Sequence, residues 1–466
     1  MISRNSSVLY NVDNNAQAES PGENYQLYKY RFIIMLIFIL AASQNIIMWS
    51  IFIPIQNHLH FAFGETLTWI NFGTILISNV SYIPANFIGN YLVSTFGLRV
   101  GVITGIILSV IGLWVRTLST HSFVWIFVGQ TFAGFAQPYF YSTPQKISNV
   151  WFGISERPWA TTLMVCSLTF GNAFGAIIPQ FFMDLATDPK NQDPGQMRSE
   201  IHRMMNLMAY VGSGCLVLIL IFMRGKPQTP SSQGAEVEAE AEKLNVSNSL
   251  KTLLKDKNVM CLLVASAIVN GSLVNYFSTI NQVTFPFGIT SSQISDIVCI
   301  STITGLIGSA VGATIIHRSR KYNWVIIGSG VISLIALVGN LLLVKSGPYA
   351  FGAVAVAYSV LIAPVLPVSL EYAMELSFPL AEATVGGLWF VVNQLSSTLE
   401  SFVIDTILDQ DGENPTQKAA SIAFYITIGI QFLGVLPLFF IKENLKRTKY
   451  EQGLLQNADE EDEKDE

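Results

Sequence analysis

The residues of this chain that could do chemistry are amides and aromatic rings that interrupt long apolar runs. Asn45 and Trp49 interrupt the first run four residues apart, which places them on one face of a helix. Gln137 interrupts a later run just before Pro138, where a helix can bend. A polar group in a lipid-embedded helix is costly unless it faces the interior of the bundle. These side chains are therefore candidates to contact a polar solute, although a Trp near the end of a span is more often an interfacial anchor and a Gln within a span more often joins two helices.

Two further apolar runs carry groups of the same kind. Tyr276, Asn281 and Gln282 lie near the end of one run, and Gln394 lies in another, shortly after a pair of glycines. Polar interruptions of this kind occur where broken helices line the path of a transported solute. Both stretches are predicted to line a pore.

Four acidic residues fall within the tenth and eleventh apolar runs. Glu371 and Glu375 are one helical turn apart, so they could share a proton, or they could form a solvated cap at the cytoplasmic end of their helix. We favour the cap and keep the pair as a candidate proton site. Glu400 and Asp405 approach the opposite side of the membrane and are expected to be solvated.

The sequence offers no pattern for catalysis, for a cofactor or for a metal. It has no phosphate-binding loop of the GxxxxGK[ST] type, no nucleophile elbow and no HExxH motif. The histidines are scattered, and the cysteines lie singly in apolar runs without a CxxC pair. We therefore predict a protein that is not an enzyme and that binds neither a cofactor, a metal nor nucleic acid.

The elements that hold these side chains are predicted to be membrane-spanning helices. Hydrophobic residues make up 51% of the 466 residues and charged residues 12%, which is too apolar for a soluble globular protein. A bilayer core needs about twenty apolar residues per helix. About twelve segments meet this requirement: 31–55, 70–94, 98–117, 123–146, 159–183, 206–223, 259–282, 294–316, 323–344, 349–372, 383–407 and 419–441.

Charged and polar stretches divide the chain. We predict a cytoplasmic N-terminal tail (1–30), a first six-helix bundle (31–224), a cytoplasmic linker (225–257), a second six-helix bundle (258–441) and an acidic cytoplasmic tail (442–466). Lys and Arg accumulate in cytoplasmic loops, and here they are concentrated in the linker, near both ends of the chain and in the even-numbered loops. Both termini are therefore predicted to be cytoplasmic.

Two six-helix bundles joined by a long cytoplasmic linker are the plan of the major facilitator superfamily, whose halves rock around a central site. The predicted fold class is an all-α membrane protein of that type. The fingerprint that follows the second span in that superfamily is partly kept, because Gly89, Gly97 and Arg99 are present while Ser94 stands near the usual aspartate. These three residues are candidates for gating, and Arg99 could equally be a simple cytoplasmic charge.

A string of residues in the fourth span and the following loop carries a closer resemblance. The string comprises residues 129–130, 136–137, 143–144 and 149–153, and further matching pieces are 28–31, 45–49, 96–99, 170–172, 281–282 and 375–379. In order and spacing these segments resemble the feline leukaemia virus subgroup C receptor-related transporters. The similarity runs through nearly all of the predicted spans and weakens in the linker and tails.

This resemblance implies a carrier of choline and ethanolamine, with heme export also discussed for members of the family. It implies a site made of an aromatic cage and glutamines, in which Trp49, Gln137 and Gln394 match family positions. An ungapped alignment puts Val274 at the family's seventh-span tyrosine, with Tyr276 two residues further on. Such a cage would hold a quaternary ammonium on the faces of its rings, and the amides would orient a hydroxyl or an amine.

We therefore expect a carrier of a small organic cation of the choline class that works by alternating access without a coupling ion. The alternatives are a proton-coupled carrier of a vitamin or organic anion, a heme exporter, and a membrane receptor or scaffold that transports nothing. The expected partners are the solute and the lipid bilayer. A monomer in the plasma membrane or an endomembrane is expected.

Overall fold

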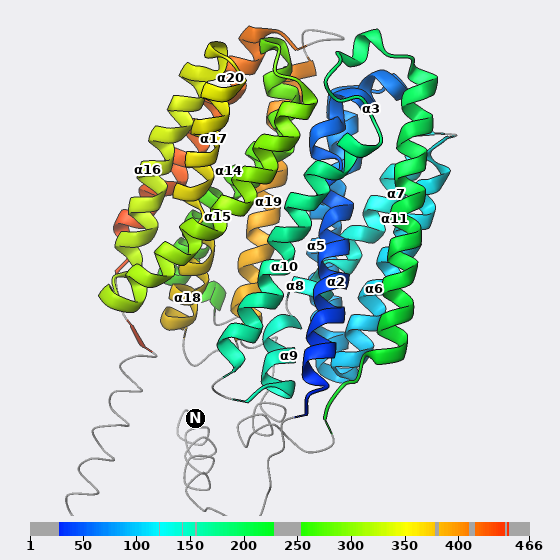
Figure 1. Cartoon of the computed structure of the whole chain (residues 1–466). Coiled ribbons are helices and arrows are strands. Elements are labelled where there is room, and N and C mark those ends of the chain that lie inside the picture. Colours follow the sequence, from blue (N-terminus) through cyan, green and yellow to red (C-terminus); the bar gives the residue numbers. More distant parts are fainter. Residues whose placement is uncertain are drawn as a thin grey trace, which may run out of the picture.

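The protein forms two groups of helices that stand side by side (Figure 1). The structure is a computed structural model that describes residues 28–227, 253–377, 382–409, 415–442 and 445–446, apart from 121, 142, 154 and 155. Within these ranges the chain is helical or in turns, and no strand is found. Nearly all of the predicted N-terminal tail, most of the predicted linker and nearly all of the acidic tail lie outside the described residues.

The first group, here called the N-terminal half, runs from α2 to α11. Its helices are α2 (Arg31–Ser50), α3 (Gln56–Phe63), α4 (Leu67–Asn71), α5 (Ile77–Phe96), α6 (Leu98–Arg116), α7 (Val124–Ala136), α8 (Pro138–Tyr141), α9 (Thr143–Trp151), α10 (Arg157–Ile177) and α11 (Pro194–Phe222). The start of α2 and the end of α11 meet, because the Tyr30 hydroxyl donates to Phe222 O at 2.7 Å. We call this side of the molecule the linker end and the opposite side the far end.

The second group, the C-terminal half, runs from α14 to α20. Its helices are α14 (Lys257–Thr284), α15 (Ser291–Ser319), α16 (Tyr322–Leu343), α17 (Pro348–Ile362), α18 (Val365–Ser377), α19 (Glu382–Leu408) and α20 (Gln417–Val435). The halves meet where α5 packs against α19 and where α10 packs against α15. In Figure 1, α19 (orange) accordingly stands next to the N-terminal half.

Nine helical stretches of the described residues are long and apolar enough to cross a membrane, by length and composition. The predicted segments 70–94, 123–146 and 383–407 are not among the nine, so the predicted total of about twelve spans stays a prediction. Each of the three carries polar side chains or a proline inside it, such as Pro84 in α5 and Glu400 in α19. These residues reduce the hydropathy or the regularity on which such a test depends.

The helix expected at 206–223 begins earlier, at Pro194. The Asp193 carboxylate accepts a hydrogen bond from Gln196 N and caps the first turn, and proline is favoured at the first helical position. Met197, Ile201 and neighbouring residues at helical spacing then bury one face of this extension in the N-terminal half. Polar residues on the opposite face lower the mean hydropathy of this segment, so the sequence did not predict it as part of the helix.

Small residues allow the helices to approach closely within each half. A Cβ on Gly112 of α6 would lie 2.6 Å from the carbonyl oxygen of Gly129 on α7. In the C-terminal half, a Cβ on Gly308 would lie 2.0 Å from Val360 O. Close backbone approach at small residues is the usual way that membrane helices associate, since lipid provides no hydrophobic drive between them.

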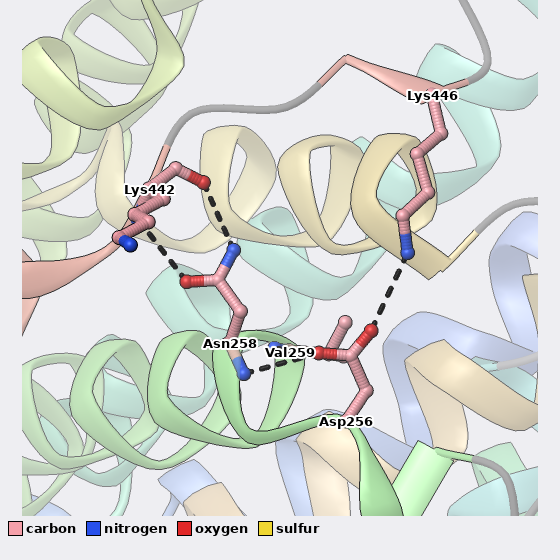
Figure 2. A network of polar contacts seen from close by, with 5 residues as sticks. All are labelled: Asp256, Asn258, Val259, Lys442 and Lys446. Carbon is pink, nitrogen blue, oxygen red and sulfur yellow. Dashed lines mark hydrogen bonds and ion pairs between the residues drawn. The ribbon is translucent and has the colours of Figure 1, made fainter.

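The segment after α20 is tied to the start of α14 (Figure 2). The Asn258 amide donates to Lys442 O at 2.9 Å and accepts from Lys442 N at 3.1 Å, while Lys446 Nζ lies 3.3 Å from Asp256 Oδ2. The other oxygen of Asp256 caps α14 by accepting from Asn258 N and Val259 N. The beginning and end of the C-terminal half are thus fastened together at the linker end.

Candidate functional site

Trp49 lies on the face of the N-terminal half that meets the C-terminal half. Its ring is half-buried and packs against an apolar cluster that spans both halves, with most of its members in the C-terminal half and others, such as Ile53 and Ala176, in the N-terminal half. Asn45, one turn earlier, donates from Nδ2 to Ser109 Oγ at 3.1 Å and to Ala133 O at 3.4 Å. Asn45 therefore joins α2 to α6 and α7, whereas Trp49 is placed at the interface between the halves.

Gln137 and Gln394 face the same interface. Tyr141 and Phe390 contact each other across it, with ring centroids 5.2 Å apart. Gln137 lies one turn before Tyr141, whose N–H donates to Gln137 O at 3.1 Å, and Gln394 lies one turn after Phe390 on α19. Because residues four apart share a helix face, both glutamines point into the interface on the far-end side of the ring pair.

The side chains of Trp49 and Gln137 lean toward each other along the bundle. Asn45 lies at the same height along the bundle as Ala133, because the two are hydrogen-bonded. Trp49 lies one turn from this level toward the far end, and Gln137 lies one turn toward the linker end. Their backbone positions are therefore about 12 Å apart along the bundle axis. Helical side chains lean toward the N-terminus of their own helix, and α2 and α7 run in opposite directions. The Trp49 Nε1 and Gln137 Oε1 atoms are both buried and have no hydrogen-bond partner among the described residues. A polar solute between them would satisfy both.

Tyr276 lies inside the C-terminal half. Its ring contacts the ring of Tyr358 on α17, with centroids 5.0 Å apart, and only 4% of the residue is exposed. Together with Thr279 and Thr427 it lines a cavity between α14, α19 and α20. The structure therefore does not bring Tyr276 together with Trp49, and no contact between them is found in the described residues.

Asn281 and Gln282 join the two halves at the far end. Asn57 donates from Nδ2 to Asn281 O at 2.9 Å and from its backbone N to Asn281 Oδ1 at 3.1 Å. Gln282 Nε2 donates to Leu67 O at 3.4 Å. Both residues thus contribute to closing this end of the molecule.

Acidic residues of α19 complete the closed far end. Asn71 Nδ2 donates to Asp405 Oδ2 at 2.6 Å, and the backbone N–H groups of Leu67 and Thr68 donate to the Asp409 carboxylate at 3.0 and 2.8 Å. All of the hydrogen bonds between the halves that the described ranges contain lie at this end, whereas the ring pair Tyr141–Phe390 lies toward the linker end.

The expectation that Glu400 and Asp405 are solvated is wrong. Glu400 is 2% exposed and Asp405 is 0% exposed. Glu400 accepts hydrogen bonds from Ser272 and Asn275, and Asp405 accepts one from Asn71. Both side chains lie against neighbouring helices because α19 packs between α5, α14 and α20.

Glu371 and Glu375 lie near the linker end of α18. Glu371 is exposed and accepts a hydrogen bond from the Tyr322 hydroxyl at 3.2 Å, while Glu375 is 6% exposed. The two carboxylates therefore differ in their access to solvent. Their use as a proton site stays a prediction.

The three candidate gating residues have different surroundings. A Cβ on Gly89 would lie 3.2 Å from Pro138 Cβ, so this glycine permits α5 to pack against α8. Gly97 has a φ of 86° in the tight turn between α5 and α6, a conformation that favours glycine. Arg99 is exposed at the start of α6.

The aromatic pair Tyr141 and Phe390 was missed in the sequence, as was Tyr82, whose ring meets that of Tyr141 edge-on at 6.0 Å. A local signal was available, because each member of the pair is four residues from a candidate glutamine. The contact itself joins segments about 250 residues apart in the chain, which no spacing pattern reports.

The two packed halves are hydrogen-bonded to each other at one end and have buried, unpartnered polar atoms at their interface. This arrangement is typical of membrane transport proteins. The chain is a multi-pass integral membrane protein and a solute carrier, of the kind whose halves move around a central site. The family model of the Major Facilitator Superfamily matches residues 33–399, and the chain belongs to this superfamily.

Curated relatives cover most of the chain. The human protein named choline/ethanolamine transporter FLVCR2 is 24% identical over 451 residues, which are 93% of this chain and 81% of that protein. The cat protein named choline/ethanolamine transporter FLVCR1 is 25% identical over 452 residues, which are 93% of this chain and 77% of that protein. The similarity to this family of transporters inferred from the sequence is thus confirmed.

Solved structures share the fold. The xylose transporter XylE from E. coli, in a partially occluded inward-open conformation, superposes with a TM-score of 0.67 at 13% identity and covers 89% of this chain and 98% of its own. A bacterial homologue of the human lysosomal transporter Spinster, inward-facing and unoccupied, gives 0.65 at 13% identity, covering 89% and 98%. The predicted all-α superfamily fold is confirmed.

Proposed function

We propose that the protein carries a small organic cation of the choline and ethanolamine class by alternating access, at a site between the halves that includes Trp49, Gln137 and Gln394. The observation that carries this proposal is the pair of buried, unpartnered atoms Trp49 Nε1 and Gln137 Oε1 at that interface. The printed names of the human and cat relatives support the substrate class.

The residues suit such a cation chemically. A quaternary ammonium has no N–H to donate, so it binds on the negative faces of aromatic rings, at about 2 kcal/mol per ring when water is excluded. Trp49 supplies one ring, and Tyr141 with Phe390 supplies a second aromatic surface toward the linker end. The Gln137 and Gln394 amides can donate to or accept from a hydroxyl or primary amine. A neutral site of this kind binds without the cost of burying a carboxylate.

The contacts between the halves indicate which end of the molecule is closed and which end can open. The far end is closed by hydrogen bonds, so the site opens toward the linker end when the contact between Tyr141 and Phe390 separates. Basic residues gather at the linker end, which supports a cytoplasmic location for it and for both chain termini. They include Arg31, Arg99, Lys146, Arg157, Arg224, Arg318, Lys321 and Lys442.

The experiment is uptake of radiolabelled choline and ethanolamine into proteoliposomes that contain the purified protein. Trp49→Ala and Gln137→Ala are each expected to abolish saturable uptake. Trp324→Ala and Gln145→Ala are the matched controls, because these two side chains are exposed on the outer surface, and they should keep the wild-type rate. Undiminished uptake in both site variants, with the protein correctly inserted, would remove this interface from the substrate path.

The same preparation tests the alternatives. Vitamins, organic anions and heme are added as competitors and as labelled substrates. Uptake of one of them, with none of choline or ethanolamine, would overturn the substrate class. A protein that binds and moves none of these solutes would support the receptor alternative.

A further inference from the structure

The buried carboxylate of Glu400 lies apart from the proposed solute site and needs a partner of its own. An ionised carboxylate in a protein interior or a bilayer is very costly unless a cation or a proton neutralises it. None of the ion pairs found in the described residues includes Glu400. Its neutralising partner must therefore be a small species that comes from solution.

The carboxylate is held by three helices. Oε1 accepts from Asn275 Nδ2 at 3.0 Å and Oε2 accepts from Ser272 Oγ at 3.0 Å, both on α14. Thr427 of α20 lies beside the carboxylate and accepts from the same Asn275 Nδ2 at 3.4 Å. The Asn275 amide is fixed in this orientation, because its Oδ1 accepts from Ser401 Oγ at 2.8 Å. The site is thus a built polar cluster within one half.

This geometry favours a proton over a metal cation. A metal ion needs oxygen atoms pointing at it, but Asn275 turns an N–H toward Glu400, and the one hydroxyl proton of Ser272 lies within reach of both Glu400 and Ile268 O, at 3.0 and 3.2 Å. The Thr427 hydroxyl donates to Ala423 O at 3.2 Å and accepts from Asn275 Nδ2 at 3.4 Å, which leaves one lone pair of its oxygen to accept from a protonated carboxyl. We propose that Glu400 is a proton-binding site inside the C-terminal half, which exchanges its proton during the transport cycle, so that transport is linked to protons instead of running without a coupling ion as the sequence led us to expect.

A small cavity with room for about one water molecule lies beside the site. Tyr276, Thr279, Thr284 and Thr427 line the cavity between α14, α19 and α20. Thr279 and Thr284 donate to backbone carbonyls of their own helix, at 3.0 and 2.7 Å, so their oxygens are available to water molecules. Thr284 is the last residue of α14, at the far end, so the hydroxyls lead from that end toward Glu400.

The groups that surround Glu400 do not compete for this proton. Tyr276 on α14 and Tyr358 on α17 are phenols, and the Tyr358 hydroxyl donates to Gln431 Oε1 at 2.9 Å. α20 contributes Thr427, and its Lys418 is exposed at the far end. On α19 itself the nearest acid is Asp405, a second buried carboxylate that no ion pair of the described residues includes, but it is bonded to Asn71 of the other half at the far end. The proton assigned to Glu400 is the one held inside the C-terminal half.

Glu400 is connected to the proposed solute site through the contact between α14 and α19. The two helices are also joined by a hydrogen bond from Asn270 Nδ2 to Asn393 Oδ1 at 3.2 Å, next to Gln394. A negative charge at Glu400 that arises when the proton leaves would be stabilised only by a change in these contacts or by entry of water. Proton exchange can in this way alter the position of Gln394, and this link rests on the proposed function.

The first test does not depend on the solute. Infrared spectra of the purified protein at neutral pH should show absorption from a protonated carboxyl, because exposed carboxyls are ionised there. One component of the band should be lost in Glu400→Gln and kept in the matched control Glu65→Gln, while Asp405→Asn identifies the component of the other buried acid. Thr427→Val removes the hydroxyl that accepts a hydrogen bond from the protonated Glu400 carboxyl, so it should shift the band. This variant keeps the test informative if Glu400→Gln does not fold. A band unchanged in both Glu400→Gln and Thr427→Val would overturn the proposal.

The second test uses choline uptake by proteoliposomes. A proton gradient should change the initial rate for the wild type and for Glu65→Gln, and should have no effect on Glu400→Gln. The variant should still exchange internal for external choline, because exchange needs no net proton movement. A sodium gradient that drives uptake, with no response to a proton gradient, would overturn the proton assignment. If choline is not transported at all, the proposed function fails, while the infrared result still decides the role of Glu400.

Discussion

The hydrogen bonds between Asn57 and Asn281 should set how much of the protein is closed at the far end. Asn57→Ala removes one bond between the halves, from Asn57 Nδ2 to Asn281 O, and leaves the backbone bond in place. Asn281→Ala removes the acceptor of the Asn57 backbone N–H and leaves that buried donor unsatisfied. The first loss amounts to about 1 kcal/mol and the second to about 2 kcal/mol. The ratio of far-end-open to far-end-closed molecules should therefore rise about fivefold and about thirtyfold.

The assay measures labelling of a single cysteine at the far end. Ala176 is fully buried where α10 meets the C-terminal half, so Ala176→Cys in a background without native cysteines reacts with a membrane-impermeant maleimide only when the far end opens. Its labelling rate should increase in the order wild type, Asn57→Ala, Asn281→Ala. Asn206→Ala is the matched control, because it breaks a bond to His202 within one half and affects both states alike. Equal rates in all three asparagine variants would refute the reasoning that these bonds hold the far end closed.

Three further predictions concern packing and the linker end. Gly308→Ala should lower the melting temperature strongly because its Cβ would overlap Val360 O, whereas Gly328→Ala, with no atom nearby, should leave it unchanged in a thermal unfolding assay. Phe390→Ala should weaken choline binding by about tenfold, measured by competition, because it removes one aromatic face. Asn258→Ala should lose both bonds to the segment after α20 and speed proteolysis there, with transport rates as the second readout.

Much of the fold follows from the sequence, because the signal for it is local. Apolar runs of about twenty residues predict helices wherever lipid is the solvent, and the interruption by a polar linker divides them into two groups. The face of the helix on which Trp49 lies could also be predicted, because Asn45, four residues earlier, lies on the same face.

The environment of the acids could not be predicted in this way. Glu400 lies near the end of a predicted span, and distance from the end of a helix is a poor guide to solvation when other helices extend as far. Ser272, Asn275 and Thr427 come from segments that are distant in the chain, and only packing brings them to the carboxylate. Tyr276 shows the same limit, because two residues of helical phase decide whether a ring points at the interface or, as here, into its own half.

The distribution of polar contacts explains how the two halves can separate. Bonds inside a half, such as those of Asn45, are buried and persist while the half moves as one body. Bonds between the halves must break in every cycle, and in the described ranges they are made by amides, hydroxyls, backbone groups, the His58 imidazole, and carboxylates that have no Lys or Arg partner across the interface. Each such bond contributes about 1 kcal/mol net, because water replaces it on opening. A buried ion pair in the same place would leave two uncompensated charges when broken, so uncharged donors allow the far end to close firmly and still open on the time scale of transport.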